Sequence, residues 1–188
     1  EVFGLRFSPD GKNLATASLD NTVRIWRRDG TPILQLEGHA GGVVNVAFNP
    51  DGTLLASASD DNTVKLWKPN GTLIQSFIGH QGWVEDVAFS PDGTFLASVG
   101  EDSTLRFWDT DGNVLHTFHQ SFPILEVEFS PDGDHLAFAG VGNTLSVWNL
   151  ELDRLLKDGC DVLSDYLQND STIAPADRHL CESVMQSK

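Results

Sequence analysis

Residues 87–108 read VAFSPDGTFLASVGEDSTLRFW, and this stretch recurs along the chain. Its turn, Ser90-Pro91-Asp92-Gly93, has counterparts that begin at Ser8, Asn49 and Ser130, so successive copies lie 41, 41 and 40 residues apart. Tryptophans keep the same spacing at Trp26, Trp67, Trp108 and Trp148. Four copies in step exclude coincidence, and a period near 41 is typical of a propeller or a helical array.

The pattern inside each copy distinguishes these two architectures. It consists of short β-rich runs separated by turn residues, without helical spacing. In the second copy we expect strands over residues 43–48, 54–59, 63–67 and 73–78. In the Pro-Asp-Gly turn, proline presets φ at the second position and glycine accepts a left-handed conformation. The sequence therefore predicts an all-β protein of repeated four-stranded antiparallel units.

These units resemble the blades of the WD-repeat β-propeller family. The resemblance covers residues 1–149, and Gly38-His39 and Gly79-His80 match the family's glycine-histidine pair. Trp108-Asp109 matches the pair that names the family. The resemblance implies four propeller blades, at about residues 1–40, 41–81, 82–121 and 122–149. It also implies a noncatalytic scaffold that holds a protein or peptide partner.

A hydroxyl, an aspartate and a tryptophan recur at fixed spacing in three copies, and two of these copies add a histidine. The sets are Thr16, Asp20 and Trp26; His39, Ser57, Asp61 and Trp67; and His80, Ser98, Asp102 and Trp108. Serine, histidine and aspartate together suggest a hydrolase triad. However, an enzyme needs one nucleophile, whereas this set repeats, and the family resemblance implies a structural hydrogen-bond network. We therefore predict no catalytic residue.

The fourth copy lacks this set. Gly142 stands at the aspartate position, Phe138 stands at the hydroxyl position, and no Gly-His pair precedes the first strand. A network that loses one member leaves its partners buried and unsatisfied, so its members should be lost together.

Partner binding is expected on loops at one end of the propeller, because the strands are committed to packing. These are the loops before the first strand of each blade and between its second and third strands. The predicted contact residues are Leu19, Asp60, Gln81, Trp83, Glu101, Phe122 and Val141. Trp83 lies off the repeat, so it either packs locally or anchors a partner.

The charge distribution argues against nucleic acid as the partner. The net charge is -15, and residues 81–188 hold 19 acidic but only 5 basic residues. Such a surface repels phosphate. The sequence has neither an apolar run of transmembrane length nor a signal segment, so we expect a soluble cytoplasmic protein without membrane contacts.

We expect no metal and no cofactor. His116 and His119 have no matching cysteine or histidine cluster, and Gly11-Lys12 is not part of a phosphate-binding loop. The prediction is a protein that is not an enzyme, and the remote alternative is a hydrolase with acidic residues along the channel.

The segment after residue 149 changes character. Leucines and a tyrosine at positions 152, 155, 156, 163, 166 and 167 follow helical spacing, which predicts a short helical tail. Gly159-Cys160 and Asp165-Tyr166-Leu167 resemble the ending of bacterial, notably cyanobacterial, WD-repeat proteins. This resemblance implies an alternative function, the sensor part of a larger signalling NTPase whose NTPase domain is not in this chain.

The two ends of the repeat array do not match a closed ring. The first copy starts at its first strand, and the fourth shows no fourth strand before the tail. We therefore expect an incomplete ring from a larger propeller. Open blade edges are templates for strand pairing, so the chain is expected to self-associate through them.

Overall fold

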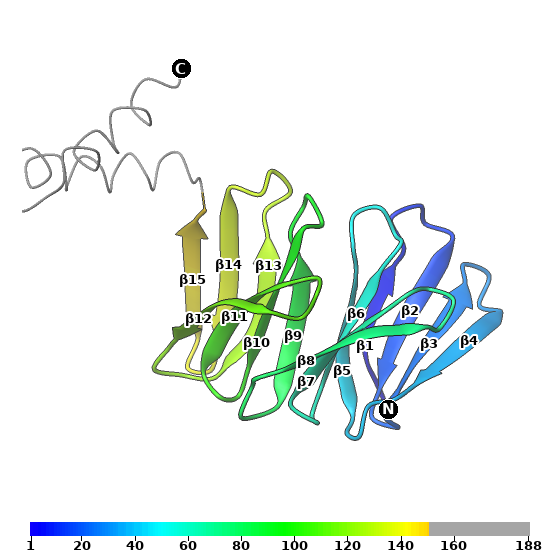
Figure 1. Cartoon of the computed structure of the whole chain (residues 1–188), viewed down its shortest axis with the longest axis horizontal. Helices are drawn as coiled ribbons and strands as arrows, with labels where there is room; N and C mark the ends of the chain where they lie inside the picture. The colour runs from blue at the N-terminus through cyan, green and yellow to red at the C-terminus, as the bar shows by residue number, and fades with distance from the viewer. Residues whose placement is uncertain (151–188) are drawn as a thin grey trace, which may run out of the picture. The chain divides into compact units, whose positions relative to one another are not determined.

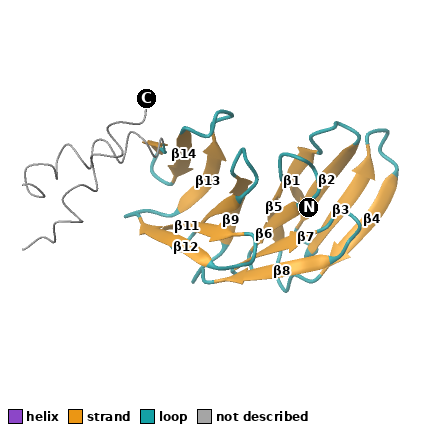
Figure 2. Ribbon diagram, turned by 45° about the horizontal axis from the view of Figure 1, so that its top comes forward, coloured by secondary structure: helices purple, strands orange, loops and turns teal. Residues whose placement is uncertain are grey.

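A computed structural model describes residues 1–150, which form strands and loops without a helix (Figure 2). In chain order the strands are β1 (Val2–Phe7), β2 (Asn13–Ser18), β3 (Thr22–Arg27), β4 (Pro32–Glu37), β5 (Val43–Phe48), β6 (Leu55–Ser59), β7 (Thr63–Trp67), β8 (Leu73–Ile78), β9 (Val84–Phe89), β10 (Phe95–Gly100), β11 (Thr104–Asp109), β12 (Val114–His119), β13 (Ile124–Phe129), β14 (His135–Gly140) and β15 (Thr144–Asn149).

The strands form four antiparallel sheets, which we number as blades one to four. Blades one to three are β1–β4, β5–β8 and β9–β12, and blade four contains β13–β15 among the described residues. The first strands of the blades, β1, β5, β9 and β13, lie next to one another (Figure 1). The predicted fold class, an all-β partial propeller, is confirmed. In the second copy, three strands have the predicted limits. The fourth, β6, begins one residue later than predicted, at Leu55 instead of Leu54.

The Pro-Asp-Gly turn joins the first two strands of every blade. In blade one the Gly11 amide donates to the Ser8 carbonyl at 2.8 Å, and Gly11 has a φ of 67°. The Asp10 carboxylate accepts from the Ser8 hydroxyl at 2.7 Å and from the Lys12 amide at 3.0 Å. These bonds, that of Ser8 above all, lower the pKa of Asp10 to about 2. The repeated aspartate therefore orders the turn.

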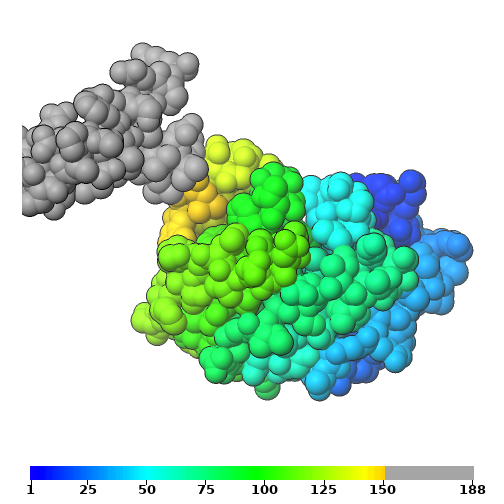
Figure 3. Space-filling model, in the orientation of Figure 1, coloured from blue at the N-terminus to red at the C-terminus, as the bar shows by residue number. Residues whose placement is uncertain are grey.

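The hydrophobic core lies between successive blades. Ala15 and Ala17 of β2 pack on one side of the first such interface, and Val43 and Val46 of β5 pack on the other. A second cluster repeats this arrangement between blades two and three. Since small alanines face larger side chains, adjacent sheets approach closely. The space-filling view shows the blades in chain order, from the blue N-terminal blade to the yellow fourth blade (Figure 3).

The turn between the second and third strands of each blade contains one residue other than glycine in the left-handed conformation. This residue is asparagine in three blades, at Asn21, Asn62 and Asn143, but Ser103 in blade three, with a φ of 60°. Asparagine accepts positive φ more readily than most residues other than glycine.

Replacing Ser103 with asparagine is therefore expected to stabilise the chain by up to about 1 kcal/mol. Urea denaturation would measure the change. The reciprocal Asn62→Ser variant serves as the matched control and should lose a similar amount. A Ser103→Asn variant that unfolds at a lower urea concentration than the wild type would contradict the backbone explanation.

Residues 1–148 and 149–188 form two separate units. The predicted tail helices and the residues of the bacterial resemblance lie outside the described residues. Within residues 1–150, no helix has the length and apolar content to cross a membrane.

Candidate functional site

The repeated polar residues of blade two form one hydrogen-bonded chain. The Trp67 indole donates to Ser57 Oγ at 2.9 Å, and Ser57 Oγ lies 2.7 Å from His39 Nε2. His39 Nδ1 lies 2.8 Å from Asp61 Oδ2. With a neutral imidazole, the serine hydroxyl donates to Nε2 and Nδ1–H donates to the carboxylate, so every polar group is satisfied.

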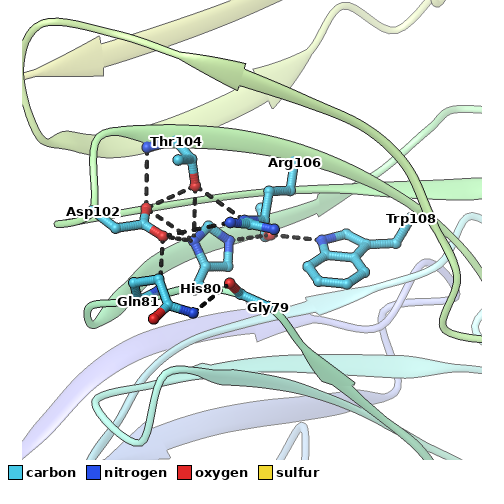
Figure 4. Close-up of polar contacts among 8 residues, drawn as sticks. Gly79, His80, Gln81, Asp102, Thr104, Arg106 and Trp108 are labelled. Atoms are coloured by element: carbon cyan, nitrogen blue, oxygen red, sulfur yellow. Dashed lines mark hydrogen bonds and ion pairs between the residues drawn. The ribbon is translucent and has the colours of Figure 1, made fainter.

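Blade three repeats this chain (Figure 4). His80 Nδ1 lies 3.0 Å from Asp102 Oδ2, and His80 Nε2 lies 2.7 Å from Ser98 Oγ, which also accepts from the Trp108 indole at 2.8 Å. Arg106 adds a bond from its Nε to Thr104 at 3.1 Å. The two blades therefore share one local geometry.

Each network aspartate also holds the loop that precedes the first strand of its blade. Asp61 accepts from the Ala40 amide at 2.8 Å and from the Thr63 hydroxyl at 2.6 Å. Burial raises the pKa of Asp61, but the hydrogen bonds from His39, Thr63 and Ala40 outweigh it and hold the pKa well below its usual range. Asp102 is held ionised in the same way, with the Gln81 amide in place of Ala40.

Sequence reasoning missed Thr63 and Thr104 as network members. Each hydroxyl donates to its aspartate and also lies within 3.4 Å of the histidine Nδ1. A signal was present, because threonine stands two residues after the aspartate position in all four copies, at Thr22, Thr63, Thr104 and Thr144.

Blade one keeps part of the network. The Trp26 indole donates to Thr16 Oγ1 at 2.9 Å, but no histidine joins them to Asp20. Asp20 instead binds Arg24 at 2.7 Å and the Thr22 hydroxyl at 2.6 Å. The predicted set of blade one is thus split into two separate contacts.

Blade four has an aromatic contact where the other blades have the network. The Phe138 and Trp148 rings meet edge to face with centroids 5.0 Å apart, and Phe118 of blade three lies 4.7 Å from Trp148. Apolar packing has therefore taken the place of the serine–tryptophan hydrogen bond.

Four predicted contact residues occupy equivalent backbone positions on one loop face. The amides of Leu19, Asp60, Glu101 and Val141 each donate to a carbonyl in the segment before the first strand of their own blade. The acceptors are Glu1, Gly42, Trp83 and Pro123, at 2.9 to 3.1 Å. Phe122 lies against Gly140, and Gln81 is exposed. The structure therefore places all seven predicted contact residues on these paired loops.

The loop face is acidic around Trp83, whose side chain is 49% exposed. The pKa of Asp60 is raised mainly by burial, and the nearby negative charges of Glu101 and Asp61 raise it further. The pKa of Glu85 is likewise raised mainly by burial, with smaller effects from the charges of Glu101 and Asp60. Like charges that repel one another this way attract a cation, and an exposed indole ring adds a cation–π surface.

Asp86 is a buried carboxylate that the sequence did not single out. It accepts hydrogen bonds from the Asn45 side chain of blade two, from the Val87 amide at 2.8 Å and from the Val127 amide of blade four at 2.9 Å. Burial raises its pKa to about 7. Asp86 borders a cavity of about 190 Å³ that is also lined by Arg6 and Glu126. It thus links the first strands of three blades.

No group of three or more acidic, histidine or cysteine side chains converges on a metal position within residues 1–150. His116 packs on Phe118, with ring centroids 4.2 Å apart, and His119 ends β12.

Comparison with known proteins identifies two similarities. A family model described as the IFT122 first beta-propeller matches residues 1–158. Ribosome assembly protein 4 from Chaetomium thermophilum is 48% identical over 48 residues, which amount to 24% of this chain and 9% of that protein. The match thus spans only a small part of that relative.

Proposed function

Because the chain belongs to the WD-repeat β-propeller family of the IFT122 first beta-propeller, we propose that it is a noncatalytic scaffold that binds a protein partner through its acidic loop face. Families of this kind are generally non-enzymatic scaffolds. Trp83 carries the proposal, since a half-exposed tryptophan on the paired loops is the kind of anchor that dominates protein interfaces.

The charges around Trp83 favour a partner segment with lysine or arginine side chains. Asp60, Glu85 and Glu101 form an acidic group, and a cationic side chain would relieve their mutual repulsion. The same charges disfavour nucleic acid as a partner. We also propose a cytoplasmic location. The alternative function is the sensor part of a larger signalling NTPase whose NTPase domain is not in this chain.

The burial of both serines supports a noncatalytic role. Ser57 and Ser98 are fully buried, and each hydroxyl already accepts a hydrogen bond from a tryptophan indole. A nucleophile must reach its substrate, so neither serine is placed to attack one. A broad screen for hydrolase activity is expected to show none.

Replacing Trp83 with alanine is expected to weaken partner binding at least about tenfold, because the variant lacks the exposed aromatic anchor. Pull-down from a cell lysate, with quantitative mass spectrometry, would compare the partners recovered by the wild type and by the variant. Binding should also weaken as salt is added, since Glu101 is exposed to solvent and Asp60 and Glu85 are partly exposed.

The matched control is Leu115→Ala, which removes an exposed apolar side chain from β12, outside the loop face. This variant should recover the same partners as the wild type. Equal recovery by Trp83→Ala and the wild type would show that the chosen face is wrong.

A further inference from the structure

The turn between β7 and β8 contains an asparagine followed by a glycine, Asn70-Gly71, a pair that occurs once in the sequence. Asn70 is exposed, and Gly71 has a φ of 96°, in the left-handed region that glycine accepts. The Gly71 amide donates to the Lys68 carbonyl at 2.9 Å, and the Thr72 amide donates to Asn70 Oδ1 at 3.1 Å. The side-chain amide of Asn70 is thus open to solvent and directly precedes the least hindered backbone nitrogen that a protein offers.

The turn between β3 and β4 of blade one has the same hydrogen bonds with an aspartate in place of the asparagine. The Gly30 amide donates to the Arg27 carbonyl at 2.9 Å, and the Thr31 amide donates to Asp29 Oδ1 at 2.9 Å. Hydrogen bonds from Thr31, that of its side chain first, lower the pKa of Asp29, so this turn stabilises a carboxylate. A carboxylate in place of the Asn70 amide would therefore fit the turn of blade two without a change of backbone.

We propose that Asn70 is a site of spontaneous deamidation, whose aspartate product gives blade two the turn that blade one already has. The Gly71 nitrogen, after losing its proton to base in solution, attacks Asn70 Cγ, and the bond from Cγ to the side-chain nitrogen breaks. The cyclic imide that forms is then opened by water between Cγ and the Gly71 nitrogen, which leaves an aspartate at position 70. In total one water molecule is consumed, one ammonium ion is released, and the chain gains one negative charge.

The residue that follows each asparagine makes Asn70 the most reactive of those in comparable turns. Asn21, Asn62 and Asn143 also lie in tight turns, but each is followed by a threonine. A β-branched side chain hinders attack by its own backbone nitrogen, whereas glycine has no side chain. These three asparagines are therefore matched controls within the same chain.

The folded turn slows the reaction without preventing it. The Gly71 nitrogen can attack only when its hydrogen bond to Lys68 opens, and exposed turns open locally at a small cost in free energy. If water opens the imide on its other side, the product is isoaspartate, with a backbone longer by one methylene group. A Cβ on Gly71 would already lie 2.9 Å from Leu34 Cδ2 of β4, so this longer backbone would disturb the packing between blades one and two. Only the aspartate product keeps the turn as it is.

Peptide mapping by mass spectrometry on the full 188-residue chain, incubated in the folded state at mildly alkaline pH, tests the proposal. The peptide with Asn70 should gain the mass that accompanies the exchange of an amide for a carboxyl group. The modified share should rise with time and with pH, because base removes the proton from the Gly71 nitrogen. The peptides with Asn21, Asn62 and Asn143 should stay unmodified over the same period.

A chain unfolded in guanidinium chloride is the positive control and should react faster, since Lys68 no longer holds the Gly71 amide. If Asn70 stays intact in the folded chain while the unfolded chain reacts, the turn protects the asparagine completely and the proposal is wrong. Equal modification of the asparagines that precede threonine would also overturn it.

The Asn70→Asp variant tests whether the turn accommodates the product. It should unfold at the same urea concentration as the wild type, and it should elute from an anion-exchange column with the modified fraction of the wild type. A lower urea midpoint would show that blade two cannot adopt the turn of blade one. The outcome is independent of partner binding, because β7 begins at the acidic loop face and this turn lies at its other end.

Discussion

The wild-type chain is expected to lose stability as the pH rises from about 4 to 7, and an Asp86→Asn variant is expected to lose most of this dependence. In the folded chain, burial raises the pKa of Asp86 from 3.8 to about 7. Between these values the folded state keeps a proton that the unfolded state releases. The free energy of unfolding therefore falls as pH rises, by about 1.4 kcal/mol per unit and at most about 4 kcal/mol over the window.

Urea denaturation of both proteins at pH 5 and pH 7.5 measures the effect. The asparagine side chain keeps one carbonyl oxygen as a hydrogen-bond acceptor but cannot ionise. Arg6 of β1 and Glu126 of β13 act on Asp86 in opposite directions, and both remain in the variant. Asp60 has a raised pKa from a different environment, so Asp60→Asn serves as the control and should keep most of the slope. An Asp86→Asn variant with the wild-type slope would contradict the assignment.

Replacing Asp102 with alanine is expected to lower the free energy of unfolding by about 1–3 kcal/mol, and Asp61→Ala should have a similar effect. The reason is that His80, Thr104 and the Gln81 amide would lose their shared acceptor. Because the pKa of Asp102 lies well below its usual range, its stabilising effect is complete above about pH 4 and is lost only in stronger acid. The effect of the substitution should therefore be the same at pH 5 and pH 8.

Asp20→Ala is the matched control for this experiment. Asp20 occupies the same position of blade one, but it has no histidine partner and its ion pair with Arg24 is partly exposed. Asp20→Ala should therefore lower the free energy of unfolding by less than about 1 kcal/mol. Equal losses for Asp20→Ala and Asp102→Ala would mean that the histidine-centred network adds no stability. None of these variants should abolish binding to the protein partner.

The repeat period and turn chemistry were enough to predict the fold from the sequence. Each Pro-Asp-Gly turn determines the structure of its own hairpin, and each tryptophan marks the third strand of its own blade. The same pattern occurs four times, so each copy supports the prediction made from the others. The limits of the strands in the second copy could be predicted from the same pattern, except that Leu54 lies just before β6. The network residues could be selected for the same reason, since their spacing recurs in successive blades.

Asp86 could not be predicted in this way. Its partners, Asn45 and Val127, lie 41 residues before and after it, and no repeated residue type marks the position. The equivalent residues in the other blades are Gly4, Asn45 and Glu126, so the repeat itself gives no hint of a buried carboxylate. The exposure of Trp83 likewise depends on how closely neighbouring loops approach, which sequence spacing does not specify.

The hydrogen bonds from Ala40 and Gln81 to the network aspartates have a consequence for recognition. They fix the loops of the acidic face when the chain folds, so little conformational entropy remains to be lost when a partner docks. Leu19, Asp60, Glu101 and Val141 differ in chemistry although their amides make the same backbone bond. The scaffold can therefore acquire new specificity by exchanging these side chains while its rigid loop framework stays unchanged.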